Sequence, residues 1–190
     1  MLILASSSSY RKKQLDQLLL KFKAIAPNID EEALKNQDLS PCAISQELSL
    51  LKAKAVLKDN RESIIIGADQ VLNFKDEIFS KPGNRDNAIK QLEALSGQTH
   101  ELITSYALIS KDKEIVESVI STMTMRKLST KQIESYVDID EPFYCCGSYK
   151  LETVGISLFE NIVCPDHSAI IGLPLISLTT NLKSFGIEVL

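Results

Sequence analysis

The stretch IIIGADQVLNF, residues 64–74, decides the fold that we expect for this chain. Its three consecutive isoleucines have the continuous apolar character of a strand that is buried on both faces. Gly67 and the polar pair Asp69 and Gln70 follow directly, so the sequence predicts that the strand stops there. In open α/β sheets, ligands bind outside the ends of such strands. We therefore expect Asp69 to be an exposed carboxylate at a binding edge.

Further elements are predicted on the N-terminal side of this stretch. Residues 2–5 predict a short buried strand, which leads through four serines into a helix with Ser9 as N-cap and with apolar residues at helical spacing as far as Phe22. A second helix is predicted from Pro41 to about residue 58, with Ser40 as its N-cap. Its apolar stripe lies beside Lys52, which could therefore reach into a cleft.

The C-terminal part continues the alternation of strands and helices. Helices are predicted after Pro82 as far as Gly97, over residues 129–138, and from near Pro174 to near Gly186. Strands are predicted over residues 100–110 and 114–128, around the turn KDKE, and His100 is expected to end a loop. This order predicts an α/β fold with a mixed, twisted sheet and flanking helices, formed by a single domain of residues 1–190.

The bulk composition restricts the kinds of partner. A chain of 190 residues with 44% hydrophobic content can bury a sizeable core, and a formal net charge of −4 argues against nucleic acid as a partner. No window has the roughly 18 apolar residues of a membrane span, and the N-terminus lacks the charge order of a signal peptide. We expect a cytoplasmic protein that binds no membrane. The four cysteines show no metal-ligand spacing and are expected to be idle thiols.

Several charged and polar residues near predicted element ends could share one polyanion. Ser6 and Arg11 lie where a serine-rich turn meets a helix N-terminus, and such a junction presents N–H groups to an anion, although a basic first turn could equally be a solvated surface. Lys81 precedes a proline and should project from extended chain. The carboxylates of Asp30, Glu31 and Asp69, together with anion contacts from Ser6, Arg11, Lys52 and Lys81, are the inventory of a phosphoryl-transfer or pyrophosphohydrolase site.

The same residues carry a family resemblance. The segments LILASSSSYRKKQL, DEE, LLKAKAV, IIGADQV, KP, LSGQTHELIT, GSYKLETVG and IIGLPLISL occur in this order along nearly the whole chain. They resemble the successive motifs of the Maf family of nucleotide pyrophosphatases. Ser9 stands where most members have a proline, whereas the arginine that follows, Arg11, is kept.

The resemblance implies an inosine-triphosphatase-like fold with two lobes around a cleft, and hydrolysis of a nucleoside triphosphate to the monophosphate and pyrophosphate. By motif position, Asp69 resembles the catalytic carboxylate, and Glu31 with Asp69 resembles the ligands of a divalent metal ion (magnesium, manganese or cobalt). The residues that resemble the phosphate-binding set are Ser6, Arg11, Lys52 and Lys81. The resemblance also makes a homodimer plausible.

Three positions resemble those that select the base. Tyr10, Gln70 and Glu152 are an aromatic, an amide and an acid, a combination that resembles the 7-methyl-GTP pyrophosphatase branch more than the dTTP/UTP branch. An aromatic face would favour the cationic ring of 7-methylguanine, and a carboxylate could accept from its N–H donors. Two alternatives stay open, namely a dTTP/UTP pyrophosphatase and a non-catalytic protein that senses nucleotides or inhibits septum formation.

Overall fold

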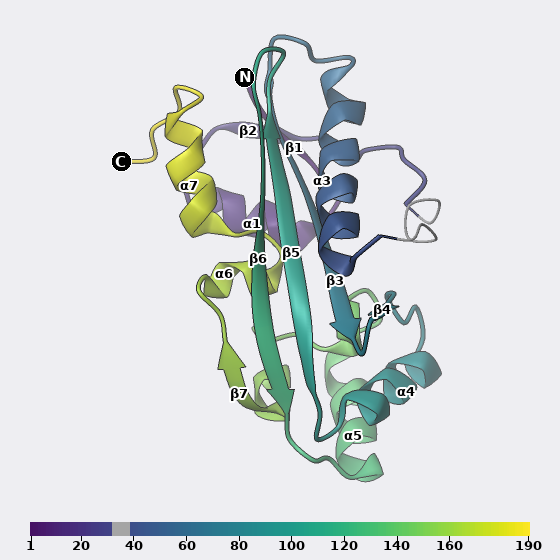
Figure 1. Cartoon of the computed structure of the whole chain (residues 1–190). Helices are drawn as coiled ribbons and strands as arrows, with labels where there is room; N and C mark the ends of the chain where they lie inside the picture. Colours follow the sequence, from purple (N-terminus) through teal and green to yellow (C-terminus); the bar gives the residue numbers. More distant parts are fainter. Residues whose placement is uncertain (32–38) are drawn as a thin grey trace. The chain divides into compact units, whose positions relative to one another are not determined.

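The computed structural model describes residues 1–31 and 39–190 and shows a sheet with helices packed on it (Figure 1). The strands are β1 (Leu2–Ala5), β2 (Phe22–Ala24), β3 (Ile64–Phe74), β4 (Glu77–Phe79), β5 (Thr99–Ile109), β6 (Glu114–Met125) and β7 (Phe159–Val163). The helices are α1 (Ser9–Asp16), α3 (Pro41–Leu57), α4 (Arg85–Leu95), α5 (Thr130–Asp140), α6 (His167–Ile171) and α7 (Leu175–Lys183), with short 3-10 turns η1 (Cys146–Ser148) and η2 (Val154–Leu158).

The seven strands form one mixed sheet in the order β2-β1-β3-β5-β6-β7, with β4 paired to β3. β1 runs parallel to β2 and β3, whereas the pairs β3–β4 and β6–β7 are antiparallel. The predicted α/β fold with a mixed sheet and flanking helices is confirmed. Within the described residues, none of the helices is long and apolar enough to cross a membrane.

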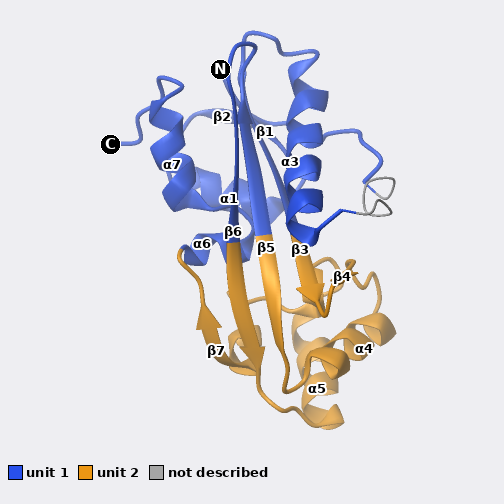
Figure 2. Cartoon of the chain, viewed as in Figure 1, with its two compact units in different colours: residues 1–70, 104–119, 166–190 blue, residues 71–103, 120–165 orange. Residues whose placement is uncertain are grey.

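The chain divides into two compact units, each assembled from segments that are separate in the sequence (Figure 2). Unit 1 comprises residues 1–70, 104–119 and 166–190, and unit 2 comprises residues 71–103 and 120–165. Strands β3, β5 and β6 contribute residues to both units. That residues 1–190 form a single domain stays a prediction.

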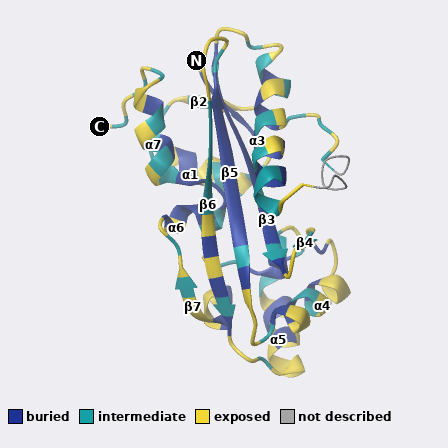
Figure 3. Cartoon of the chain, viewed as in Figure 1, coloured by how far each residue is buried: buried dark blue, intermediate teal, exposed yellow. Residues whose placement is uncertain are grey.

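In unit 1 the sheet has a helix layer on each face. Side chains alternate along the strands, so successive residues pack against different layers. Leu2, Leu4, Ile66 and Tyr106 belong to a core cluster with α1 and α7. The intervening residues Ile3, Ala5, Ile65 and Ala107 pack with Ala53 and Val56 of α3. Figure 3 shows β1 and most of β3 and β5 in the colour of buried residues. Both faces are therefore covered, which explains the continuous apolar run at the start of β3.

At Gly67 the backbone of α3 lies close against β3. A Cβ added there would lie 2.2 Å from the carbonyl oxygen of Ser49 and 2.8 Å from the backbone nitrogen of Ala53. Both are backbone atoms of one helix, so a side chain at this position could be fitted only if α3 moved away. The glycine does not end the strand; it lets a helix approach it.

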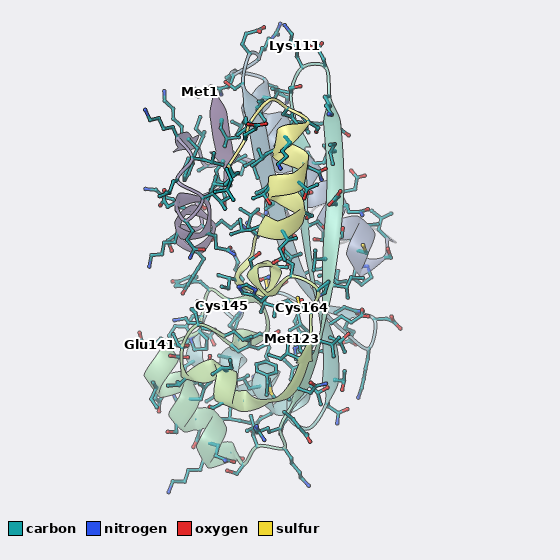
Figure 4. All side chains as sticks on the ribbon, turned by 90° about the vertical axis from the view of Figure 1, so that its left-hand side faces the viewer. Met1, Lys111, Met123, Glu141, Cys145 and Cys164 are labelled. Carbon is teal, nitrogen blue, oxygen red and sulfur yellow. The ribbon has the colours of Figure 1, made fainter. Side chains whose placement is uncertain are left out.

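Several local predictions are confirmed in detail. Ser40 caps α3 by accepting a hydrogen bond from the N–H of Ala43 at 3.2 Å, and Pro41 opens the helix. The turn between β5 and β6 closes through the N–H of Ser110 and the carbonyl of Lys113 at 2.8 Å. Lys111, labelled in Figure 4, lies in this turn and pairs with Glu62.

Other boundaries differ from the prediction. β3 does not stop before Asp69 but continues to Phe74, because the side chains of Asp69 and Gln70 find partners in α3 and α6. α1 is capped by Ser8 rather than Ser9 and ends at Asp16, and Phe22 begins β2 instead of lying in that helix. Residues 22–24 pair with β1, and this strand pairing stabilises β2 in a way that local helical spacing does not reveal.

The core of unit 2 contains an aromatic cluster around His100. The imidazole is 3% exposed, and its Nε2 lies 3.0 Å from the hydroxyl of Tyr149. Its ring centroid lies 5.7 Å from that of Tyr149 and 6.1 Å from that of Phe159. The prediction that His100 ends a loop is wrong, since it is the second residue of β5 and is held by these rings. Burial lowers the pKa of His100 to about 4.

We expect His100 to make the protein less stable in mild acid. Because its pKa falls from an ordinary value near 6.5 to about 4 on folding, the unfolded chain binds the proton more tightly, and stability present above pH 6.5 is lost as the pH falls toward 4. From pH 7 to pH 5 this residue should cost about 2 kcal/mol of unfolding free energy. Urea denaturation of His100→Gln, which keeps a polar partner for Tyr149, should show a flatter pH dependence. His167→Gln, at the exposed histidine, is the control and should leave the slope unchanged.

Cys145 is a thiol of unit 2 whose pKa is raised. Cys145 is half-buried and is labelled in Figure 4. Burial raises the pKa of its thiol to about 11. Since the thiolate is the reactive form, this side chain is a poor nucleophile at neutral pH.

Candidate active site

A buried lysine lies between two carboxylates in unit 1. The Nζ atom of Lys52 is 2.6 Å from Oδ1 of Asp69 and 3.1 Å from Oε1 of Glu31. The side chains of Lys52 and Asp69 are each 7% exposed, whereas that of Glu31 is 41% exposed. Three of the residues predicted to share a site, from α3, β3 and the segment after β2, are therefore in direct contact. The expectation that Asp69 is exposed is wrong, because the lysine shields it.

The alternation of β3 explains this contact. Residues 65, 67 and 69 share the strand face that α3 covers, so the Asp69 side chain points toward the helix. Ser45, Ser49 and Lys52 occupy the buried side of α3. The two serines are small enough for the close approach at Gly67, and the hydroxyl of Ser45 donates to the backbone carbonyl of Asp69 at 3.4 Å. The lysine one turn further on then reaches the carboxylate.

The donor set suits a hard divalent cation. Asp69 and Glu31 supply carboxylate oxygens from two different segments, and both are drawn to the same positive charge. Mg²⁺ is commonly bound by one or two carboxylates together with waters and substrate phosphates. In the described residues, no three His, Cys, Asp or Glu side chains gather in a way that would hold a metal by themselves. Glu32, the last residue of the DEE segment, lies outside the described residues.

The serine-rich loop between β1 and α1 is ordered by its own side chains. The buried hydroxyl of Ser6 accepts from the N–H of Ser8 at 3.1 Å, and the hydroxyl of Ser8 accepts from the N–H of Arg11 at 3.4 Å. The guanidinium of Arg11 donates through Nε to the carbonyl of Gly172 at 2.9 Å. Arg11 is thus fixed against the segment that follows α6, and Tyr10 lies half-buried beside it in α1.

Gln70 is oriented toward the opposite face from Asp69. Its Nε2 lies 2.9 Å from the hydroxyl of Thr104 and 3.0 Å from the carbonyl oxygens of both Ala169 and Ile170. Backbone carbonyls can only accept, so the nitrogen of this amide, and not its oxygen, faces α6. Adjacent residues of one strand therefore serve two layers, with Asp69 bound to α3 and Gln70 bound to α6.

Two predicted site residues belong to unit 2. Lys81 is exposed in the segment between β4 and α4. Glu152 is exposed in the segment that follows Tyr149. That these two side chains act together with the residues of unit 1 stays a prediction.

A family model described as Maf-like protein matches residues 1–185. The chain belongs to the Maf family. A Maf relative from Bdellovibrio bacteriovorus, named 7-methyl-GTP pyrophosphatase, is 42% identical over 177 residues, which are 93% of each chain. One of the same name from Pseudoalteromonas translucida is 41% identical over 193 residues and covers 100% of this chain and 94% of its own.

Similarity to solved structures is weaker for this Maf chain. A HAM1 protein from Coxiella burnetii aligns with 65% of this chain and 72% of its own, at 18% identity and a TM-score of 0.46. That similarity is too low for an inference, so the expected likeness to inosine triphosphatases, with two lobes around a cleft, stays a prediction.

The structure of this Maf chain adds residues that the sequence pattern did not single out. Thr104 and the backbone carbonyls of α6 hold Gln70, and Gly172 receives Arg11. Backbone carbonyls carry no side-chain signal, and residues 167–171 were not among the predicted helices. Had the strand been predicted to continue through Asp69 and Gln70, the alternation of its side chains would have placed these two residues on opposite faces.

Proposed function

We propose that this chain is a nucleoside triphosphate pyrophosphatase that hydrolyses 7-methyl-GTP to 7-methyl-GMP and pyrophosphate. The observation that carries the proposal is the contact of the buried Lys52 ammonium with the carboxylates of Asp69 and Glu31. A carboxylate suited to accept a proton from water thus lies beside an ammonium suited to bind phosphate. The names of relatives at about 40% identity support the substrate.

The proposed reaction assigns a role to each polar group. A carboxylate oxygen of Asp69 takes a proton from water while the water oxygen forms a bond to the α-phosphorus of the nucleotide. The bond from that phosphorus to the oxygen bridging to the β-phosphate breaks, and its electron pair leaves with pyrophosphate. Lys52 and Arg11 then stabilise the negative charge on the phosphate oxygens, together with Ser6 and Lys81.

A divalent metal ion suits the same carboxylates. Bound by Asp69 and Glu31 together with phosphate oxygens of the substrate, magnesium, manganese or cobalt would supply charge neutralisation at the reacting phosphate. The two carboxylates do not choose among these hard ions. The metal, a homodimer and a cytoplasmic location are part of the proposal.

Base selection is assigned to Tyr10, Gln70 and Glu152. The 7-methylguanine ring is cationic, so stacking on the aromatic face of Tyr10 would favour it over uracil or thymine. The exposed carboxylate of Glu152 would accept from the ring N–H and the exocyclic amine. Gln70 would contribute through the orientation that α6 gives it.

The deciding experiment is pyrophosphate release from a panel of nucleotides with each of the three metals. We expect a kcat/KM for 7-methyl-GTP at least tenfold above that for GTP, UTP and dTTP. Equal turnover of dTTP and 7-methyl-GTP would overturn the substrate, and absence of turnover with every nucleotide would overturn the activity.

Replacing Tyr10 with alanine tests whether a base stacks on it. Loss of stacking should weaken binding of 7-methyl-GTP by about 1–3 kcal/mol, seen as a higher KM. Tyr10→Phe is the matched variant and should keep wild-type KM, because it retains the aromatic face. A KM that is unaffected by Tyr10→Ala would show that the base lies elsewhere.

A further inference from the structure

The segment formed by α6 and the residues after it is a row of backbone carbonyls on which side chains from three other elements converge in unit 1. Gln14 of α1 donates to the carbonyl of Ser168 at 2.7 Å, and Arg11 donates to that of Gly172 at 2.9 Å. From the sheet, Gln70 of β3 and Thr104 of β5 both donate to the carbonyl of Ala169, at 3.0 and 2.8 Å. The carbonyls exposed by a short helix are thus used to hold side chains.

A buried carboxylate fixes this row in place. Asp166 is 4% exposed, and its Oδ1 accepts from the N–H of Ser168 at 2.9 Å and from the Ser168 hydroxyl at 2.5 Å. Its Oδ2 accepts from the N–H of Ile176 at 2.9 Å, and the Ser168 hydroxyl accepts from the N–H of Leu175 at 2.7 Å. One acid and one hydroxyl therefore fasten α6 to the start of α7.

Thr104 connects this row to Gln70, one of the residues assigned to base selection. Its side chain is fully buried, and its hydroxyl accepts from Nε2 of Gln70 at 2.9 Å while it donates to the carbonyl of Ala169 at 2.8 Å. Gln70 also donates to the carbonyl of Ile170 at 3.0 Å. The orientation of the Gln70 amide is therefore determined by Thr104 and α6 together.

Arg11 is set by the same segment from the other side. Gly172 has a φ of +131°, which L side chains rarely adopt, and a Cβ there would lie 3.4 Å from Nε of Arg11. The arginine thus lies directly on the backbone of this glycine. A shift of α6 would move a predicted phosphate-binding group and a predicted base-selecting group together.

We propose that Thr104 and Asp166 are positioning residues for substrate selection, because they fix the carbonyl row that holds Gln70 and Arg11. The inference rests on the proposed function, since it concerns selection among nucleoside triphosphates. Neither side chain is assigned a contact with the nucleotide. Base recognition and phosphate recognition are coupled through α6.

The test compares Thr104→Val with Thr104→Ser in the full-length chain. Valine has the shape of threonine without the hydroxyl, so we expect the ratio of kcat/KM for 7-methyl-GTP to that for UTP to fall roughly tenfold, mostly through a higher KM for 7-methyl-GTP. Serine keeps the hydroxyl and should restore the ratio. The control is Thr124→Val, which removes the contact between Thr124 and Thr99 at 3.1 Å and should leave the ratio unchanged.

A double-mutant cycle separates positioning from general loss of structure. In a Gln70→Met background, Thr104→Val should change the ratio by less than twofold, because the amide that it orients is gone. Asp166→Asn should reproduce the fall in the ratio, and it provides the same test should Thr104→Val fail to fold. A variant that lost only structure would lower kcat for every nucleotide alike.

The failures of the two proposals are distinguishable. A wild-type chain that releases no pyrophosphate from any nucleotide would remove the proposed function and this inference with it. An active and selective wild type whose ratio survives both Thr104→Val and Asp166→Asn would overturn this inference alone, as would an equal effect of Thr124→Val.

Discussion

Asp69→Asn should lower kcat for 7-methyl-GTP at least about 100-fold, which is the lower range of what a general base contributes. Asparagine has nearly the shape of aspartate, and its amide oxygen can still accept from Lys52, whose Nζ lies 2.6 Å from the native carboxylate. It cannot take a proton from water. The KM should therefore change by less than about threefold. The measurement is steady-state pyrophosphate release, with nucleotide binding followed by calorimetry.

The matched control for this substitution is Asp138→Asn. Asp138 also accepts from a cation, since Oδ1 lies 2.7 Å from Nε of Arg85, but its side chain is 57% exposed and has no assigned role in the reaction. Its kcat should equal that of the wild type. Retention of more than a third of wild-type kcat by Asp69→Asn would remove Asp69 as the proton acceptor. A cellular effect that persisted in an inactive Asp69→Asn protein would instead favour the non-catalytic alternative.

Lys52→Met should have the largest effect on stability. Lys52 and Asp69 are each 7% exposed, so removal of the ammonium leaves a carboxylate buried without its cation. Removal of one partner of a buried ion pair costs about 3–5 kcal/mol of unfolding free energy. Adding Asp69→Asn to Lys52→Met should recover most of this loss, because no buried charge is then left. Urea denaturation of the two single variants and the double variant measures the coupling.

The control for this cycle is another lysine of the same helix. Lys54 pairs with Glu114 at 3.0 Å, but the two side chains are 52% and 45% exposed. Water screens such a pair, so Lys54→Met should cost less than about 1 kcal/mol. A loss of that small size for Lys52→Met as well would show that the Asp69 carboxylate does not depend on the lysine.

The elements predicted best are those that are specified locally. Ser40 and Pro41 start α3 as predicted, and α5 begins at Thr130, one residue after the start of the helix predicted over residues 129–138, with a capping box of Ser129 and Gln132. The turn between β5 and β6 is likewise specified by neighbouring residues. Capping and turn formation act over a few residues, so they can be inferred from sequence alone.

The end of β3 could not be predicted because it depends on distant partners. Asp69 and Gln70 look like residues that end a strand, yet Lys52 lies 17 positions from Asp69, and the carbonyls that hold Gln70 lie 99 and 100 positions from it. A polar residue in a strand is stable when its hydrogen bonds are satisfied, and this depends on the tertiary structure. His100 was assigned to a loop for the same reason.

The candidate site divides along the same line. Motif resemblance selected Asp69, Lys52, Glu31 and Arg11, and the structure describes contacts for each of them. The motif resemblance gave no indication of Thr104. Its hydroxyl links two other segments, because it accepts from Gln70 of β3 and donates to the carbonyl of Ala169 in α6. A residue that only orients another site residue cannot be recognised from its own side-chain chemistry in the sequence.

The two-residue period of β3 also makes this site sensitive to changes in chain length. Insertion or deletion of a single residue between Ile64 and Asp69 would rotate every later side chain of the strand to the opposite face. The carboxylate of Asp69 would then face the carbonyl oxygens of α6, which repel a negative charge. The uncharged amide of Gln70 would face Lys52 and would not neutralise its ammonium. The number of residues between Ile64 and Asp69 must therefore stay fixed for the acid to reach Lys52.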